Sequence, residues 1–176
     1  GAIGGQYVEA GDTAARQQYF INVEGSNFND VITGDLNNNI ITPNDGVDTI
    51  DGADGTDTIA FTYATQGAAI NLQDQSENVV IANNGYGKST GTLKNFENIK
   101  GSTHNDSLRG NQLLNDIKGG EGDDFINGGG GKDTLDGESG IDTLSFIGAI
   151  TDVVFAFNPQ DISIKPNNGW NDIYAQ

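Results

Sequence analysis

Apolar residues recur at every ninth position in two long stretches of the chain. Four nine-residue units run from Gly25 to Ala60, and five more run from Gly101 to Ser145. The eighth residue of every unit is isoleucine or leucine, at Ile32, Ile41, Ile50, Ile59, Leu108, Ile117, Ile126, Leu135 and Leu144. One apolar side chain between two outward ones makes a strand of only about three residues. The pattern therefore predicts a stack of very short strands whose apolar side chains all point inward.

The other positions of the unit are polar or turn-forming. Turn formers fill most of the first five positions, and the sixth is Asp in seven of the nine units and Asn in the other two, Asn39 and Asn115. Two consecutive units, with their short strands on opposite faces, would form one turn of a flattened coil. The sixth residue of one unit then lies above the sixth residue two units later. The sequence thus predicts a solenoid that brings carboxylates together in pairs.

Carboxylates paired in this way predict a divalent cation. Two carboxylates that approach each other repel, and a cation between them removes the repulsion. Calcium accepts about six to eight hard oxygen ligands, main-chain carbonyls included, whereas zinc and copper prefer imidazole or sulfur. The chain has one histidine and no cysteine. Calcium is therefore the expected ion.

The overall composition also points to a fold that depends on a cation. Of the 176 residues, 35% are hydrophobic and 26 are glycine, which is too little apolar surface for an ordinary globular core. The 25 acidic and 8 basic residues give a net charge of -17, which opposes binding to nucleic acid or to anionic membranes. No cysteine can form a disulfide, and no apolar run is long enough to enter a bilayer. We therefore expect the metal-free chain to be largely unfolded, with calcium ions as its main partner.

The pattern divides the chain into five segments and indicates an all-β fold class. We expect a lead-in strand or helix segment at 1–24, repeat blocks at 25–60 and 101–145, a β-rich connecting segment without the motif at 61–100, and C-terminal strands at 146–176. Helix signal is weak throughout, with residues 14–20 as the best candidate. The chain begins at Gly1 without methionine or signal peptide, so we expect a piece of a larger protein.

Other chemistries fit the sequence less well. An EF-hand is excluded, because no acidic loop is followed at the required spacing by a bidentate glutamate. The only histidine, His104, falls in a turn, and neither G-x-S-x-G nor H-E-x-x-H occurs. We therefore expect no catalytic residues and no enzyme activity in this segment. Ice binding would need regular ranks of threonine or asparagine on one face, whereas the outward seventh position is mixed. A surface polysaccharide or another extracellular ligand stays open as a further partner.

The units GGEGDDFIN, GGGGKDTLD and GADGTDTIA resemble the RTX, or hemolysin-type, calcium-binding nonapeptide repeat. The resemblance implies a right-handed parallel β-roll, a β-solenoid with two repeat blocks here. Each calcium would be held by sixth-position residues and loop carbonyls of repeats n and n+2. On this chain the resemblance pairs Asp30 with Asp48, Asn39 with Asp57, Asp106 with Asp124, Asn115 with Asp133, and Asp124 with Asp142. About five calcium sites follow.

Two kinds of position depart from the family pattern. The family prefers glycine at the fourth position, but the first two repeats of each block carry Phe28, Asn37, His104 and Leu113 there. Pro43 also replaces the opening glycine of the third repeat.

The resemblance implies a function as well. RTX repeats are calcium-dependent structural modules of larger proteins, and the resemblance implies type I secretion from a Gram-negative bacterium. We expect an extracellular, secreted or surface module of an adhesin, toxin or hydrolase that folds on calcium binding after export. One alternative is a calcium-stapled carbohydrate- or ligand-binding module. Another is a non-catalytic repeat module of a secreted enzyme such as a protease or an alginate epimerase.

Overall fold

Short strands make up nearly all of the regular structure. The computed structural model describes residues 15–16, 21–74, 79–83, 88–145, 152–156 and 162–164. Among these residues the only helical element is η1 (Leu72–Asp74), a single 3-10 turn. Within the helix candidate at 14–20, Ala15–Arg16 form strand β1, and the rest of that candidate lies outside the described residues.

Three sheets hold the strands, and one of them runs through both repeat blocks. The long sheet contains β2 (Asn22–Glu24), β4 (Ile40–Thr42), β6 (Thr58–Ala60), β10 (Asn98–Lys100), β12 (Asp116–Glu121), β14 (Lys132–Ser139) and β16 (Asp152–Ala156), in this order. A second sheet contains β1, β3 (Val31–Thr33), β5 (Thr49–Asp51), β9 (Lys88–Lys94) and β8 (Val79–Asn83). The third contains β7 (Ala69–Asn71), β11 (Ser107–Arg109), β13 (Phe125–Asn127), β15 (Asp142–Leu144) and β17 (Ile162–Ile164).

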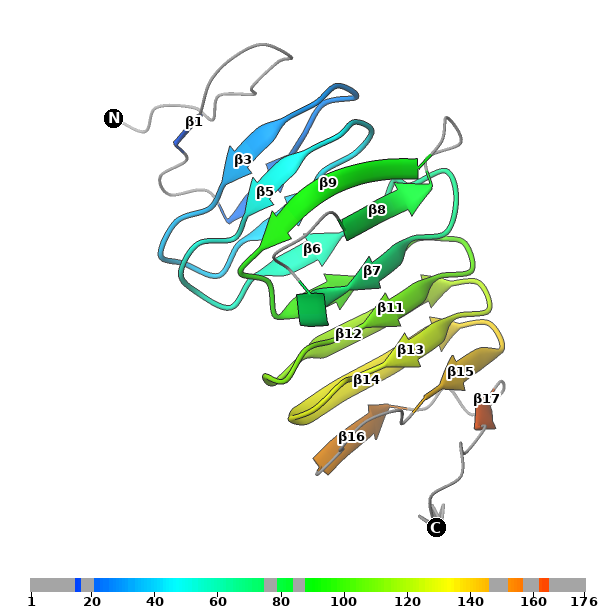
Figure 1. Cartoon of the computed structure of the whole chain (residues 1–176). Helices are drawn as coiled ribbons and strands as arrows, with labels where there is room; N and C mark the ends of the chain where they lie inside the picture. The colour runs from blue at the N-terminus through cyan, green and yellow to red at the C-terminus, as the bar shows by residue number, and fades with distance from the viewer. Residues whose placement is uncertain are drawn as a thin grey trace.

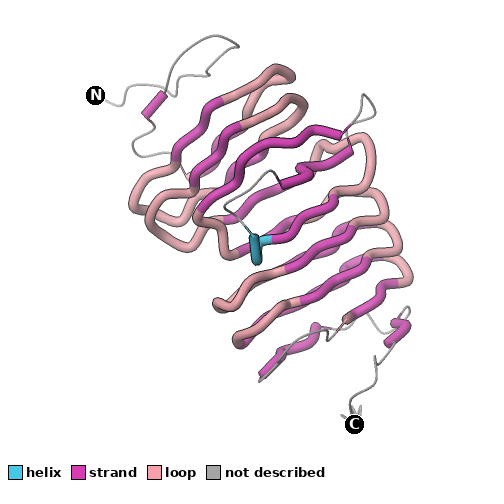
Figure 2. The backbone as a smooth tube through the Cα atoms, in the orientation of Figure 1, coloured by secondary structure: helices cyan, strands magenta, loops and turns pink. Residues whose placement is uncertain are grey.

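Successive repeats alternate between the two faces of the stack (Figure 1). Strands of every second repeat pair in parallel and in register, so that Ile32 lies opposite Ile50 and Leu108 opposite Ile126. Of the described strand pairs, only β8 with β9 is antiparallel. Figure 2 shows the loops gathered along the two edges of the stack. The fold is therefore the predicted all-β parallel β-roll, with two repeats in each turn of the coil.

The eighth-position side chains form the core, as their spacing predicts. Ile41, Ile50, Ile59, Leu108 and Ile117 are 0% exposed, and Ile32, Ile126 and Leu135 are also buried. Leu144 is half-buried and packs against this cluster. Burying one such side chain contributes about 1.5–3 kcal/mol to folding. The file of isoleucine and leucine side chains is thus the main apolar stabilisation of the roll.

The connecting segment continues the roll between the two blocks. β10 pairs with β6 on one side and β12 on the other, and β7 pairs with β11. Phe61, Ile70, Leu72, Leu93, Phe96 and Ile99 of this segment are buried in the same core cluster. The second face is interrupted, because β9 and β8 end one sheet and β7 begins the next. The division of the chain into five domains stays a prediction, and both blocks share one long sheet.

Candidate metal site

The sixth residue of each repeat lies where the loop ends and the strand begins, and its side chain is enclosed by the stack. Eight of these residues are at most 4% exposed: Asp30, Asn39, Asp48, Asp57, Asp106, Asn115, Asp124 and Asp133. Asp142, in the last repeat, is half-buried. Ionised carboxylates are rarely buried unless a donor or a cation compensates them. These positions therefore need partners.

Each predicted pair is joined by a hydrogen bond from the main chain of one repeat to the side chain two repeats later. The N–H of Asp30 donates to Asp48 Oδ1 over 2.9 Å, and the N–H of Asn39 donates to Asp57 Oδ1 over 2.7 Å. The same bond joins Asp106 to Asp124 (2.8 Å), Asn115 to Asp133 (3.0 Å) and Asp124 to Asp142 (2.9 Å). All five predicted pairs are thus neighbours in the stack.

We call the first two repeats of each block the leading repeats (25–33, 34–42, 101–109 and 110–118). In each of them, the sixth side chain accepts a hydrogen bond from a main-chain N–H of the same loop. The N–H of Ser26 donates to Asp30 Oδ2 over 2.7 Å, and the N–H of Asp35 donates to Asn39 Oδ1 over 2.9 Å. In the second block the equivalent bonds run from Ser102 to Asp106 Oδ2 (2.6 Å) and from Asn111 to Asn115 Oδ1 (2.9 Å). The second-position N–H therefore points at the sixth side chain in all four leading loops.

We call the other five repeats the trailing repeats (43–51, 52–60, 119–127, 128–136 and 137–145). Their loops have a different backbone conformation. Their second and fourth residues all have φ between +61° and +140°, at Asn44, Gly46, Ala53, Gly55, Gly120, Gly122, Gly129, Gly131, Glu138 and Gly140. Side chains are strained in this region, so glycine at the fourth position relieves the loop. A Cβ on Gly46 would also lie 2.5 Å from Phe28 O and 2.6 Å from Asp48 Oδ1. A carbonyl oxygen and a carboxylate oxygen thus lie close together around Gly46, as they also do around Gly25 and Gly101 of the leading loops.

In four of the five trailing loops, one carboxylate oxygen of the sixth residue has no hydrogen-bond donor. The Oδ2 atoms of Asp48, Asp57, Asp124 and Asp133 are buried and accept no hydrogen bond. Almost all buried polar atoms in folded proteins are satisfied, so four unsatisfied oxygens at equivalent positions call for a cation. Carboxylate and carbonyl oxygens are the ligands that calcium prefers. The donor set in these loops therefore fits a calcium ion.

Burial makes the ionised form of these carboxyl groups costly. Desolvation raises the pKa of Asp48 and of Asp124 to about 7 and the pKa of Asp57 to about 6, and neighbouring carboxylates add to the shift. Burial also raises the pKa of Asp133. The main-chain donors lower each pKa but do not outweigh the desolvation. A cation beside Oδ2 would restore the ionised form.

The arrangement of side chains limits which metal can bind. Among the described residues, no three His, Cys, Asp or Glu side chains converge on one point. A cation in the loops must therefore take main-chain carbonyl oxygens as further ligands. Calcium tolerates such a mixed and flexible oxygen shell, whereas zinc takes nitrogen and sulfur ligands in a closed tetrahedron.

One acidic residue with a sixth-position role was missed by the sequence reasoning. Glu97 Oε2 accepts the N–H of Asp57 over 2.8 Å, so Glu97 continues the file of sixth side chains where the two blocks meet. Ile99 follows Glu97 by two residues, which is the spacing of the repeat, and this was the available signal. The glycine-rich loop that precedes it in true repeats is absent.

A second missed feature is a ladder formed by fifth-position side chains on the outside of the loops. Each side-chain oxygen accepts the N–H of the fifth residue two repeats later: Asn29 from Val47 (2.9 Å), Asn38 from Thr56 (3.0 Å), Asn105 from Asp123 (2.9 Å) and Asp123 from Ile141 (2.9 Å). These bonds tie neighbouring loops together. Asparagine and aspartate at that position read as ordinary turn residues in the sequence.

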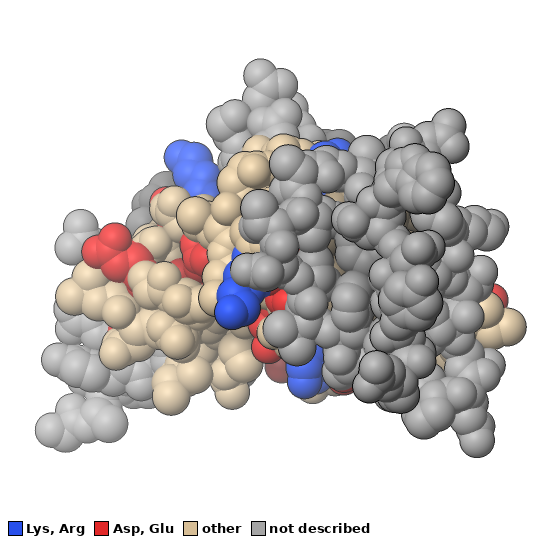
Figure 3. All heavy atoms as spheres, turned by 90° about the horizontal axis from the view of Figure 1, so that it is seen from below, with Lys and Arg blue, Asp and Glu red and all other residues tan. Residues whose placement is uncertain are grey.

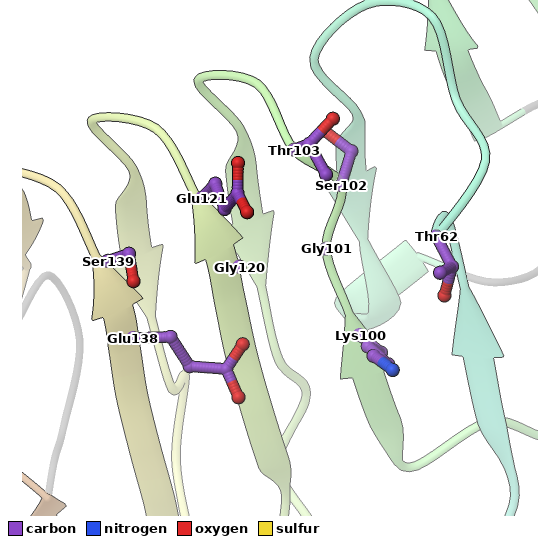
Figure 4. A pocket seen from close by; sticks show the side chains of 9 residues that line it. All are labelled: Thr62, Lys100, Gly101, Ser102, Thr103, Gly120, Glu121, Glu138 and Ser139. Atoms are coloured by element: carbon purple, nitrogen blue, oxygen red, sulfur yellow. The ribbon is translucent and has the colours of Figure 1, made fainter.

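An open hollow of about 420 Å³ lies beside the second block (Figure 4). Its lining includes Lys100 of β10, Glu121 of β12 and Glu138 of β14. The hydroxyl of Ser102, also in the lining, donates to Asp106 Oδ1 over 2.8 Å and is committed to its own loop. We assign no catalytic role to this hollow.

Acidic and basic side chains of the described residues lie close to one another in the view of Figure 3. Eight sixth-position side chains are at most 4% exposed, so part of the net charge of -17 is inside the roll. Among the described residues, no helix has the length and apolarity that crossing a membrane requires.

A parallel β-roll with oxygen-lined loops defines a class of calcium-binding repeat proteins. Residues 24–59 and 114–144 match the RTX calcium-binding nonapeptide repeat, in four copies. Both blocks therefore carry RTX repeats, and the chain contains a calcium-binding structural repeat module. The repeat itself is non-catalytic. No curated protein matches the chain.

Proposed function

We propose that this chain is a module of a larger secreted or surface protein and that it folds when calcium fills its trailing loops. The observation that carries the proposal is the set of four buried Oδ2 atoms without a donor, on Asp48, Asp57, Asp124 and Asp133. Each would be one ligand of a calcium ion, together with carbonyl oxygens of its loop. Asp142 would complete a set of about five sites.

The fifth site rests on the likeness of its loop to the others. A Cβ added to Gly137 would meet Asp142 Oδ2 first, just as one added to Gly119 would meet Asp124 Oδ2 and one added to Gly128 would meet Asp133 Oδ2. Glu138 and Gly140 also have the left-handed φ values of the trailing loops. Asp142 Oδ2 thus lies beside the first residue of its own loop, as the Oδ2 atoms of Asp124 and Asp133 do.

Calcium can supply enough free energy to decide whether the roll folds. A site that is filled at about 10 to 100 times its dissociation constant stabilises the folded state by roughly 1.4 to 2.7 kcal/mol. About five such sites together match the net stability of a typical domain, about 5–15 kcal/mol. Without the ions, buried carboxylates and a net charge of -17 oppose compaction.

This coupling suits a protein that leaves the cell. The chain would stay unfolded at the low calcium concentration of the cytosol, pass an export channel and fold outside, where calcium is abundant. Type I secretion is the route that we propose. The larger protein could be an adhesin, a toxin or a secreted hydrolase, because calcium-driven folding would depend only on the residues of the repeats.

Calcium binding to the purified chain, measured by equilibrium dialysis and calorimetry, tests this proposal. We expect about five calcium ions per chain and little binding of magnesium, which demands a tighter octahedral shell. Asp133→Asn should lose one ion, because its Oδ2 faces the loop without a donor. Asp116→Asn is the matched control, since Asp116 is an exposed seventh-position residue in the neighbouring repeat. No calcium binding at millimolar concentration would refute the proposal.

A further inference from the structure

We propose that the four leading repeats bind no calcium and that hydrogen bonds from their second residue take the place of the ion. This inference rests on the proposed function, because it concerns which loops the ions occupy. Four predicted ligands would then hold neighbouring coils together by hydrogen bonds and would not bind calcium: Asp30, Asn39, Asp106 and Asn115.

The donors around the leading aspartates are complete. Asp106 Oδ2 accepts the N–H of Ser102 over 2.6 Å, and Asp106 Oδ1 accepts the Ser102 hydroxyl over 2.8 Å and the N–H of Ala68 over 2.5 Å. Asp30 accepts the N–H of Ser26 over 2.7 Å and the Ser26 hydroxyl over 3.0 and 3.1 Å. Several donors at one carboxylate favour its charged form and lower its pKa, although burial still raises the pKa of Asp106 above its ordinary value. Neither side chain has an oxygen without a donor.

A local turn holds the second residue in place in all four loops. Its side chain accepts the N–H of the fourth residue: Phe28 to Ser26 (3.2 Å), Asn37 to Asp35 (2.8 Å), His104 to Ser102 (3.0 Å) and Leu113 to Asn111 (2.8 Å). Ser, Asp and Asn side chains make such turns readily. No residue of the leading repeats has a positive φ. This loop therefore accepts large fourth-position residues, which explains the departures from glycine.

The identity of the sixth residue agrees with this division. Asparagine occurs there only in leading repeats, at Asn39 and Asn115, and all five trailing repeats have aspartate. A calcium site would lose a charged ligand with asparagine, whereas a hydrogen-bonded loop needs only an acceptor oxygen. The amide of Asn115 also donates to Glu97 O (2.5 Å) and to Asn111 Oδ1 (3.1 Å), which a carboxylate cannot do.

The leading repeats are therefore calcium-independent turns on which the calcium loops stack. Their main-chain N–H groups hold the first trailing carboxylates, as Asp30 holds Asp48 and Asp106 holds Asp124. In each block, the leading repeats thus position the carboxylates of the metal-binding loops that follow.

Isosteric amide variants of the full chain, Asp106→Asn and Asp30→Asn, test the inference against their trailing partners, Asp124→Asn and Asp48→Asn. The native Asn39 and Asn115 show that a leading loop forms with an amide at this position. We expect both leading variants to bind as many calcium ions as the wild type. In Asp30→Asn the amide can replace Oδ1, which accepts only the Ser26 hydroxyl, so dissociation constants should change by less than about threefold. In Asp106→Asn the amide must face an N–H group, so this variant should also lose stability. Each trailing variant should bind at least one ion fewer.

The outcomes separate this inference from the function on which it rests. Loss of an ion in Asp106→Asn or Asp30→Asn, with about five ions bound to the wild type, would overturn the inference alone. A wild-type chain that binds no calcium would overturn the proposed function and the inference with it.

Discussion

In four of the five trailing aspartates, the two carboxylate oxygens have different roles. Oδ1 accepts the N–H of the sixth residue two repeats earlier, as Asp133 does from Asn115 over 3.0 Å. Oδ2 remains buried without a donor in Asp48, Asp57, Asp124 and Asp133. The first bond fixes how the coils stack, and the second oxygen is available for a cation. A carboxylate can do both because it has two equivalent acceptors.

The raised pKa values predict that calcium binding weakens as the pH falls. The pKa of Asp48 and of Asp124 is about 7 and the pKa of Asp57 is about 6, because the buried anions are desolvated. These groups must release protons when they bind the ion. We expect lower calcium affinity at about pH 5 than at about pH 8, with protons released on binding. Calorimetry in buffers of different ionisation enthalpy measures both quantities, and equal affinity at the two pH values would contradict this.

Without calcium, the folding stability should depend on pH in the opposite direction and increase as the pH falls. A carboxyl group whose pKa is higher in the folded state stabilises that state fully below its unfolded pKa. This contribution is lost as the pH rises through the folded pKa, about 6 to 7 for Asp48, Asp57 and Asp124. The metal-free roll should therefore be more stable near pH 4 than near neutral pH, and far-UV circular dichroism in chelator should show a larger β signal near pH 4 than near pH 7.

At the scale of the element, a three-residue strand is enough to set the register of the roll. β3 and β7 place one buried residue between two exposed ones, and the buried residue lies opposite its equivalent in the next coil. The sequence period predicts these strands because a buried eighth position must recur. β12 and β14 are longer than predicted, since Gly120 pairs with Glu138 beyond the usual three residues. Such pairing depends on the neighbouring coil and leaves no local pattern.

Truncating a core side chain should lower the free energy of unfolding much more than truncating an exposed loop side chain. Ile117 is 0% exposed, whereas Leu114, three residues earlier, is 59% exposed. Ile117→Ala should lower the free energy of unfolding by about 2–5 kcal/mol, because it removes buried apolar surface and leaves a cavity. Leu114→Ala should change it by less than about 0.5 kcal/mol. Urea unfolding in saturating calcium compares the two variants, and equal losses would argue against a core built from eighth positions.

At the scale of the whole molecule, strand pairing joins the two blocks. β6 of the first block pairs with β10, which pairs with β12 of the second. The sequence predicts the blocks, the inward file of residues and the five neighbouring pairs, because these follow from a strict period. It does not predict the continuity through Glu97 and β10, where the repeat loses its loop. It marks the leading loops through their fourth residues and, in two of them, through the sixth-position Asn39 and Asn115. The role of Ser26 and Ser102 could not be predicted, because it depends on where their N–H and O–H groups point.

One sheet that spans both blocks implies that they fold together. Far-UV circular dichroism of the chain in a chelator, followed by titration with calcium, is the most direct test of calcium-driven folding. At neutral pH we expect little β signal in the chelator and a single cooperative rise to a β spectrum as calcium is added, with no such rise for magnesium. A β spectrum that is already complete in the chelator and does not change with calcium would contradict calcium-driven folding.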